Sequence, residues 1–153
     1  MSVKIIKTET EHWPAVKLIG KTGTAWGDWW ANGWFDILEK SGTVAPVNGD
    51  SFIGLKRGKE YWIGMLFTPD TPVPEDFSAV PLPGGEVAFC YVYGPEDSSD
   101  FFTPETQMLC TAALKEKGLM PAKNGIMIER YACPNYTTPD EQGNVILDLG
   151  FTL

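Results

Sequence analysis

The residues most able to do chemistry lie in one short segment near the end of the chain, residues 125–131. If this segment is a β-strand, its side chains alternate between two faces, and Met127, Glu129 and Tyr131 share one of them. A carboxylate among sulfur and aromatic carbon is costly to bury, and a bound cation would offset that cost. The spacing therefore predicts a ligand site. Two alternatives stay open: Glu129 pairs with a lysine or arginine, or it is exposed at a sheet edge.

Aromatic side chains form the second candidate feature. The sequence has six tryptophans, and Trp26, Trp30 and Trp34 are four residues apart, which places them along one side of a helix. Core packing explains many such rings, but ring faces also bind flat aromatics and cations, at about 0.5–2 kcal/mol per cation–π contact. The candidate walls of a cavity around Glu129 are Trp30, Trp34, Tyr61, Trp62, Tyr91, Tyr93, Met127 and Tyr131. Because neighbours on a strand point to opposite faces, only one of Tyr61 and Trp62 can face this cavity.

Other chemistries lack the residues that they need. His12 is the only histidine, and the three cysteines, Cys90, Cys110 and Cys133, are widely spaced. The sequence therefore predicts no disulfide framework, no zinc site and no histidine-dependent nucleophile. A net charge of −8 with scattered lysines and arginines argues against direct binding of nucleic acid. We expect no metal and no cofactor.

The chain must position these residues with a small set of elements, which we expect to repeat in two halves of one domain, about residues 1–75 and 76–153. The expected elements are strands at 14–20, 51–55 and 61–68 with a helix at 25–40, and then strands at 86–93, 126–132 and 145–153 with a helix at 103–117. Thr103 and Pro104 mark the start of the second helix. The segment around His12 is expected to be loose, and the proline-rich residues 69–83 to be a crossover.

This order of elements predicts an α+β fold. Two β-α-β-β units can place their strands in one antiparallel sheet with both helices on one side. A cleft would then lie on the opposite side or at the seam between the helices. No apolar run approaches the ~20 residues of a membrane span, and the first residues lack the apolar core of a signal peptide. We therefore expect a cytoplasmic protein, with an exposed strand edge or tryptophan face available for a homodimer.

Several short segments follow one another in a characteristic order and cover nearly all of the chain. They are VKLIG at 16–20, WFDIL at 34–38, IGL at 53–55, YWIGM at 61–65, PGGEVA at 83–88, the helix around Pro104, IERY at 128–131 and VILDL at 145–149. In this order and spacing the chain resembles the GyrI-like family, also described as the effector-binding domain of AraC-type and multidrug-sensing regulators. Each segment is short, so the resemblance depends on their combination.

The resemblance implies a duplicated strand-helix-strand-strand fold with a ligand cleft along a pseudo-twofold axis. It also implies that Glu129 lies at the cleft and meets lipophilic cations. Unlike the regulators, this sequence shows no helix-turn-helix segment, so we expect a stand-alone protein for aromatic or cationic small molecules, acting alone or with a separate protein partner. Some family members hydrolyse strained cyclopropane-bearing toxins with this glutamate, and others inhibit DNA gyrase. The alternatives are therefore a hydrolase in which Glu129 is the general base, and a protein-interaction module such as a gyrase inhibitor.

Overall fold

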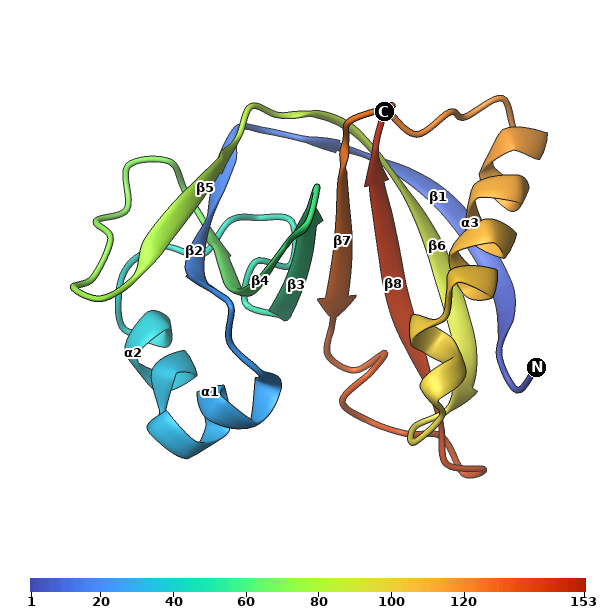
Figure 1. Ribbon diagram of the computed structural model, residues 1–153, viewed down its shortest axis with the longest axis horizontal. Coiled ribbons are helices and arrows are strands. Elements are labelled where there is room, and N and C mark those ends of the chain that lie inside the picture. Colours follow the sequence, from blue (N-terminus) through green and yellow to red (C-terminus); the bar gives the residue numbers. More distant parts are fainter.

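Eight antiparallel strands form one sheet, and all the helices lie on the same side of it (Figure 1). The computed structural model describes residues 1–153. The strands are β1 (Lys4–Trp13), β2 (Val16–Thr22), β3 (Phe52–Arg57), β4 (Glu60–Phe67), β5 (Ser78–Leu82), β6 (Gly85–Pro95), β7 (Ile126–Tyr131) and β8 (Asn144–Thr152). Their order across the sheet is β1-β6-β8-β7-β3-β4-β2-β5. The predicted α+β class with an antiparallel sheet is confirmed.

The sheet has the same topology on both sides of the seam between β3 and β7. Outward from the seam, the strands run β3-β4-β2-β5 on one side and β7-β8-β6-β1 on the other. Each side contains a strand-helix-strand-strand unit, but its edge strand comes from the other part of the chain. β1 precedes the first unit and pairs with β6 of the second, whereas β5 directly precedes β6 and pairs with β2. The two edge strands therefore link the two sides of the sheet.

These edge strands are the elements that the sequence pattern did not indicate. The segment around His12 is not loose but belongs to β1, where His12 pairs in register with Glu86. Most β1 side chains are polar and partly exposed, which hides their alternation. β5 lies inside the expected crossover and includes Pro81, which pairs with Lys17. An edge position tolerates a proline because one side of the strand needs no N–H donor.

The helix expected at 25–40 is two helices, α1 (Trp26–Asn32) and α2 (Trp34–Glu39). Gly33 separates them in the left-handed region, with φ of +65°. Only glycine adopts this conformation without strain, and it is the common way to end a helix. The prediction of one continuous helix is wrong, and the break turns Trp34 away from the side that Trp30 occupies.

The helix α3 (Pro104–Glu116) begins as predicted, because Thr103 accepts a hydrogen bond from the Thr106 backbone N–H at 3.3 Å. A short 3-10 helix, Ser99–Phe102, comes directly before it. None of the helices has both the length and the apolar character needed to cross a membrane.

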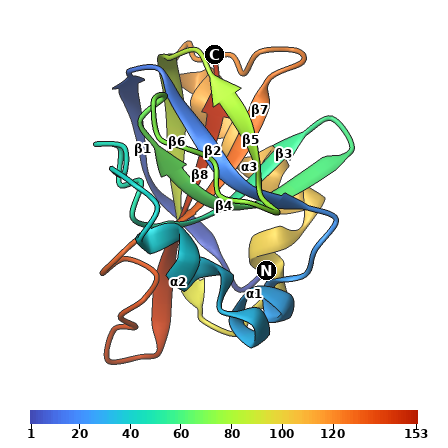
Figure 2. The same ribbon diagram turned by 90° about the vertical axis from the view of Figure 1, so that its left-hand side faces the viewer.

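Both faces of the sheet are buried. On the helix side, one apolar cluster packs against α3 and another against α1 and α2, and both reach Trp26 and Phe52. On the other side, the strong twist of the sheet (Figure 2) brings side chains from its two ends into one cluster, which includes Leu18, Val80 and Phe89. The seam between β3 and β7 therefore lies at the centre of the molecule, with a helix on each side of it.

Candidate ligand-binding site

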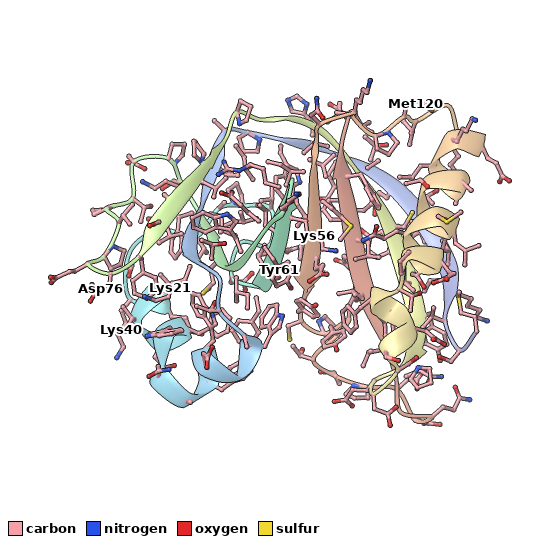
Figure 3. The ribbon with its side chains drawn as sticks, viewed as in Figure 1. Lys21, Lys40, Lys56, Tyr61, Asp76 and Met120 are labelled. Atoms are coloured by element: carbon pink, nitrogen blue, oxygen red, sulfur yellow. The ribbon has the colours of Figure 1, made fainter.

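A cavity of about 510 Å³ opens on the helix side of the β3–β7 seam. Such a volume is typical of small-molecule sites. Thirteen residues line it: Trp26, Trp30, Phe52, Lys56, Tyr61, Phe101, Phe102, Gln107, Met127, Glu129, Tyr131, Tyr136 and Leu149. Figure 3 shows two of them, Lys56 and Tyr61, beside the central strands between α1 and α3. Most of the lining is apolar or aromatic, so its few polar groups determine which ligand fits.

Glu129 lies at the centre of this lining, opposite Gly54 in the β3–β7 pairing. Only 6% of Glu129 is exposed. Its Oε1 accepts hydrogen bonds from the hydroxyls of Tyr61 at 2.5 Å and Tyr131 at 3.0 Å. The Tyr61 hydroxyl in turn accepts one from the Trp26 indole N–H at 3.1 Å. Two phenols therefore hold one oxygen of the carboxylate, and the indole holds one of these phenols in place.

No cation of the chain neutralises this carboxylate. Glu129 takes part in none of the ion pairs of the structure. Its second oxygen, Oε2, accepts no hydrogen bond and is not among the side-chain atoms sealed inside the protein. Glu129 is therefore neither ion-paired nor exposed at an edge, which removes both alternatives that the sequence left open. One carboxylate oxygen remains available to a ligand.

A glycine makes room for this arrangement. A Cβ at position 54 would overlap both Oε1 of Glu129 and the hydroxyl of Tyr61. Any larger residue at Gly54 would therefore displace the hydrogen bond between them. The strand β3 positions the carboxylate by leaving space opposite it, and not by contributing a polar group.

The tyrosines beside Glu129 stay protonated. Burial raises the pKa of Tyr61 far above its ordinary value of 10.0, and the negative charge of Glu129 raises it further. The same two causes, in the same order, raise the pKa of Tyr131. Both hydroxyls are consequently hydrogen-bond donors at any physiological pH, which suits them to orient a carboxylate.

Aromatic rings form the walls of the cavity in edge-to-face contacts. The Trp26 and Tyr131 rings lie 5.0 Å apart at 74°, and those of Tyr131 and Tyr136 lie 4.8 Å apart at 81°. Trp30 packs against Phe52 at 4.9 Å and 88° but remains 57% exposed. Large apolar rings are costly to leave in water. Trp30 is therefore available to cover a bound molecule.

The structure brings five of the nine predicted site residues to the cavity: Trp30, Tyr61, Met127, Glu129 and Tyr131. Of the neighbours on β4, Tyr61 faces the cavity and Trp62 packs in the core on the other side of the sheet. This result follows the period-two alternation of a strand.

The remaining predicted residues, Trp34, Tyr91 and Tyr93, also lie outside the cavity lining. Trp34 follows the break at Gly33, and the Lys21 ammonium lies 4.6 Å from the centre of its ring. Tyr91 is buried on the far side of the sheet, where its hydroxyl donates to Glu9 at 3.0 Å. Tyr93 donates to Asp140. The prediction that Tyr91 and Tyr93 share one face of β6 is correct. That face, however, is the one without the helices, so neither tyrosine reaches the cavity.

Several lining residues were not predicted as site residues. Phe52 and Lys56 are two positions on either side of Gly54, so alternation along β3 puts them on the face of Glu129. Trp26 belongs to the same tryptophan stripe as Trp30. Tyr136 lies in the loop after β7, where no periodic pattern could have indicated it.

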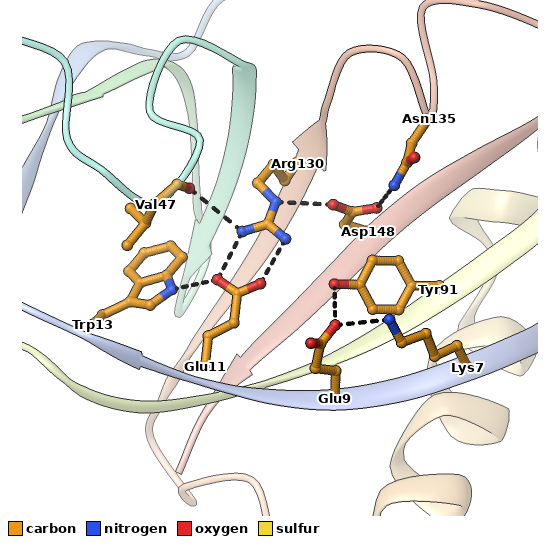
Figure 4. Close-up of polar contacts among 9 residues, drawn as sticks. All are labelled: Lys7, Glu9, Glu11, Trp13, Val47, Tyr91, Arg130, Asn135 and Asp148. Carbon is orange, nitrogen blue, oxygen red and sulfur yellow. Dashed lines mark hydrogen bonds and ion pairs between the residues drawn. The ribbon is translucent and has the colours of Figure 1, made fainter.

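The opposite face of β7 carries a second charged residue, Arg130, which forms ion pairs with two carboxylates (Figure 4). Its guanidinium donates from Nη1 and Nη2 to the two oxygens of Glu11, at 3.0 and 2.9 Å, and from Nε to Asp148 at 2.9 Å. It also lies 4.1 Å from the centre of the Phe89 ring. Only 1% of Arg130 is exposed. This network attaches β1 and β8 to β7 directly behind the cavity.

Arg130 lowers the pKa of both carboxyls of the network, but burial opposes it to different extents. Burial raises the pKa of Glu11, but hydrogen bonds from Arg130 and Trp13 outweigh it and hold the pKa below its ordinary value of 4.5. Asp148 is buried more deeply, and burial raises its pKa above the ordinary 3.8 although Arg130 and Asn135 oppose the increase. Glu11 is therefore the carboxyl whose charge the fold favours.

Comparison with known proteins gives similarity of fold without similarity of sequence. No family model matches the chain, and no curated protein matches it either. One similar solved structure is that of SAV2435 bound to tetraphenylphosphonium, which is 11% identical, with 95% of this chain and 93% of that chain covered and a TM-score of 0.59. Another is a Staphylococcus aureus MU50 protein provisionally described as a bacterial transcription regulation protein, which is 9% identical, with 95% and 97% covered and a TM-score of 0.59. At these identities the likeness establishes a shared fold.

Proposed function

We propose that this protein binds lipophilic, cationic aromatic molecules in the cavity, with Glu129 as the counter-charge. The observation that carries the proposal is the buried carboxylate without a cationic partner. Removing a carboxylate from water without such a partner costs free energy, and a bound cation offsets that cost. Tyr61 and Tyr131 hold Oε1, so Oε2 is the atom that would meet the ligand's charge.

The similar proteins support this proposal. Tetraphenylphosphonium, the ligand of SAV2435, is a cation surrounded by aromatic rings, and SAV2435 shares the fold of this chain. The rings around Glu129 offer the same complementarity, since aromatic faces attract cations and also bury apolar surface. Together with the segments that resemble the GyrI-like family, this leads us to propose an effector-binding domain over residues 1–153, built of two related halves.

The test compares a cation with a neutral aromatic molecule. Tetraphenylphosphonium and neutral triphenylphosphine oxide are titrated into wild type and Glu129→Gln, with the fluorescence of the cavity tryptophans as the signal. We expect the substitution to weaken the cation at least about tenfold, or about 1.4 kcal/mol, and to change the neutral compound by less than about twofold. Glu105→Gln, which removes an exposed carboxylate on α3, is the matched control and should behave like wild type.

Two results would contradict the proposal. If Glu129→Gln weakened both compounds equally, the carboxylate would not act through its charge. If neither compound gave saturable quenching of wild type, the cavity would not be a site for this class of molecule.

Hydrolysis is a second candidate function, and the free Oε2 of Glu129 is the observation that favours it. A carboxylate oxygen without a hydrogen bond can accept a proton from a water molecule. Tyr61 and Tyr131 are protonated donors next to it. In this reaction, water attacks a strained electrophilic carbon while Glu129 takes the proton, and the opened ring carries away the electron pair. Product formation that disappears in Glu129→Gln would support hydrolysis, and recovery of the intact compound after prolonged incubation would exclude it for that compound.

A third candidate function, a protein-interaction module such as a gyrase inhibitor, stays a prediction. The cytoplasmic location also stays a prediction. A gyrase supercoiling assay with added protein tests the inhibitor directly.

A further inference from the structure

One lysine is the only cationic side chain in the cavity lining. Lys56 lies on β3, in register with Met127 of β7 and on the same face as Phe52. It is exposed, and it takes part in no ion pair of the structure. It also makes no cation–π contact, unlike Lys4, Lys7 and Lys21. The ammonium group of Lys56 is therefore not neutralised within the chain.

The two charges of the cavity are held apart by the sheet. Glu129 is in register with Gly54, and Lys56 is in register with Met127, two residues away on each strand. Lys56 and Glu129 are therefore diagonal neighbours across the antiparallel pair, and residues in this relation lie roughly 7–8 Å apart. Glu129 is buried at the seam, whereas Lys56, which Figure 3 labels, is exposed. The cavity thus has a buried negative charge and a positive charge at its mouth.

A ligand with positive charge alone would meet only one of these charges favourably. The Lys56 ammonium repels it, because the Coulomb energy decreases only with the first power of distance. A ligand that also carries an anion turns this repulsion into attraction. Lys56 therefore favours molecules with both charges over simple cations of similar size.

We infer that the cavity takes zwitterionic aromatic molecules, whose cationic centre meets Glu129 and whose carboxylate or similar anion meets Lys56. The inference rests on the proposed function, since it assumes that Glu129 binds a cation. The diagonal placement of the two positions, roughly 7–8 Å apart, sets the class of molecule: the anion is at the end of an arm of comparable length that leads from the cationic centre to the mouth of the cavity.

Three phosphonium probes test this inference. (4-Carboxybutyl)triphenylphosphonium has a carboxylate on an arm of suitable length, pentyltriphenylphosphonium has an uncharged arm of similar length, and (carboxymethyl)triphenylphosphonium has a carboxylate close to phosphorus. We expect wild type to bind the carboxybutyl probe about fivefold more tightly than the pentyl probe, as one solvent-exposed charge pair provides. The carboxymethyl probe should gain no such advantage, because its arm is too short.

Variants at Lys56 then test whether this residue causes the tighter binding of the carboxybutyl probe. Lys56→Gln and Lys56→Met, which keep most of the side-chain length, should remove the advantage of the carboxybutyl probe and strengthen binding of the pentyl probe. Lys59→Gln is the matched control, since Lys59 is exposed nearby but does not line the cavity. Glu129→Gln should weaken both probes.

The results separate the two proposals. If both probes bind in a Glu129-dependent way but the carboxylate gives no advantage, or the advantage persists in Lys56→Gln, the zwitterion inference is overturned and the proposed function stands. An advantage that Lys59→Gln also removes would assign the effect to general surface charge and overturn the inference as well. If neither probe depends on Glu129, the proposed function fails and the inference fails with it.

Discussion

Glu129 and Arg130 are neighbours on β7, and the fold treats their charges in opposite ways. On the far face of the sheet, Arg130 is surrounded by two carboxylates and the Phe89 ring, so its charge is fully paired. On the helix face, Glu129 is almost as deeply buried, but its neighbours are phenols and an indole and it has no cationic partner. One strand therefore separates a buried charge that has ion-pair partners from one that has none.

This difference divides the two faces by role. Buried charges normally persist in proteins only when they are paired, because each unpaired one costs several kcal/mol or more. Departures from such local rules concentrate at functional sites. Arg130 follows the rule and belongs to the framework that holds β1, β7 and β8 together. Glu129 departs from it. On the helix face, an unpaired carboxylate lowers the stability of the free protein, and a bound cation would offset that cost.

The strongest test of this division is to break the ion pairs of Arg130 with Glu11 and Asp148, on the side of the sheet without helices (the framework face). Arg130→Met should lower the free energy of unfolding by about 3–5 kcal/mol, because Glu11 and Asp148 lose their common partner. Glu129→Gln should raise it or leave it within about 1 kcal/mol of wild type, because the change removes a buried charge that has no cationic partner. Urea denaturation of both variants measures the contrast. Similar losses in the two would show that the faces do not differ in this way.

The next test fills the space that β3 leaves opposite Glu129. Gly54→Ala should cost about 1–3 kcal/mol of stability, as overpacking does, and should weaken tetraphenylphosphonium by displacing Tyr61 from Glu129. Gly27→Ala is the matched control, since Gly27 is in α1 with open space around it. That change should stabilise the protein by about 0.5–1 kcal/mol. Unchanged binding in Gly54→Ala would mean that the hydrogen bond between Tyr61 and Glu129 does not position the carboxylate for the ligand.

A smaller effect is expected from acid on the framework face. The pKa of Glu11 is lower in the folded protein than its ordinary value of 4.5, so folded Glu11 binds its proton less readily than unfolded Glu11. Its contribution to stability is therefore complete above pH 4.5 and is lost as the pH falls through the lower folded value.

Urea denaturation at a series of pH values measures this loss. Between about pH 6 and about pH 3, the stability of wild type should fall more steeply than that of Glu11→Gln. The difference between the two slopes reports on Glu11 together with its effect on Asp148, whose pKa the charge of Glu11 raises. Parallel slopes would show that the pair of Glu11 and Arg130 contributes no pH dependence.

Much of the second unit could be read from the sequence, because its signals are local. The Thr103-Pro104 start of α3 is a complete capping signal, and the alternation around Glu129 is sufficient to put Met127 and Tyr131 beside it. The fold class followed from the order of such elements. None of these inferences required knowledge of which segments meet in space.

The missed features depend on tertiary contacts. A glycine inside an apolar helical pattern costs only about 1 kcal/mol, so the pattern around Gly33 favoured a continuous helix and put Trp34 in line with Trp30. The edge strands β1 and β5 lack clear alternation because packing covers them incompletely. On β6, alternation grouped Tyr91 with Tyr93 correctly, but only the small Ala88 and Cys90 of the other face leave space for α3. Residue size on the two faces was the signal that could have indicated which one carries the helix.

The smallest expected effect concerns the tyrosine of the framework face. Tyr91 and Tyr61 both donate a hydrogen bond to a glutamate, Tyr91 to Glu9 and Tyr61 to Glu129, so removing one hydroxyl makes a matched pair of variants. Tyr61→Phe should weaken tetraphenylphosphonium because Glu129 and Trp26 both lose a partner. Tyr91→Phe should leave its affinity within about twofold of wild type, since a rigid sheet separates it from the cavity. Fluorescence titration of the two variants decides the matter. If both weakened binding equally, the two faces of the sheet would be coupled, and the separation between framework and binding site would not hold.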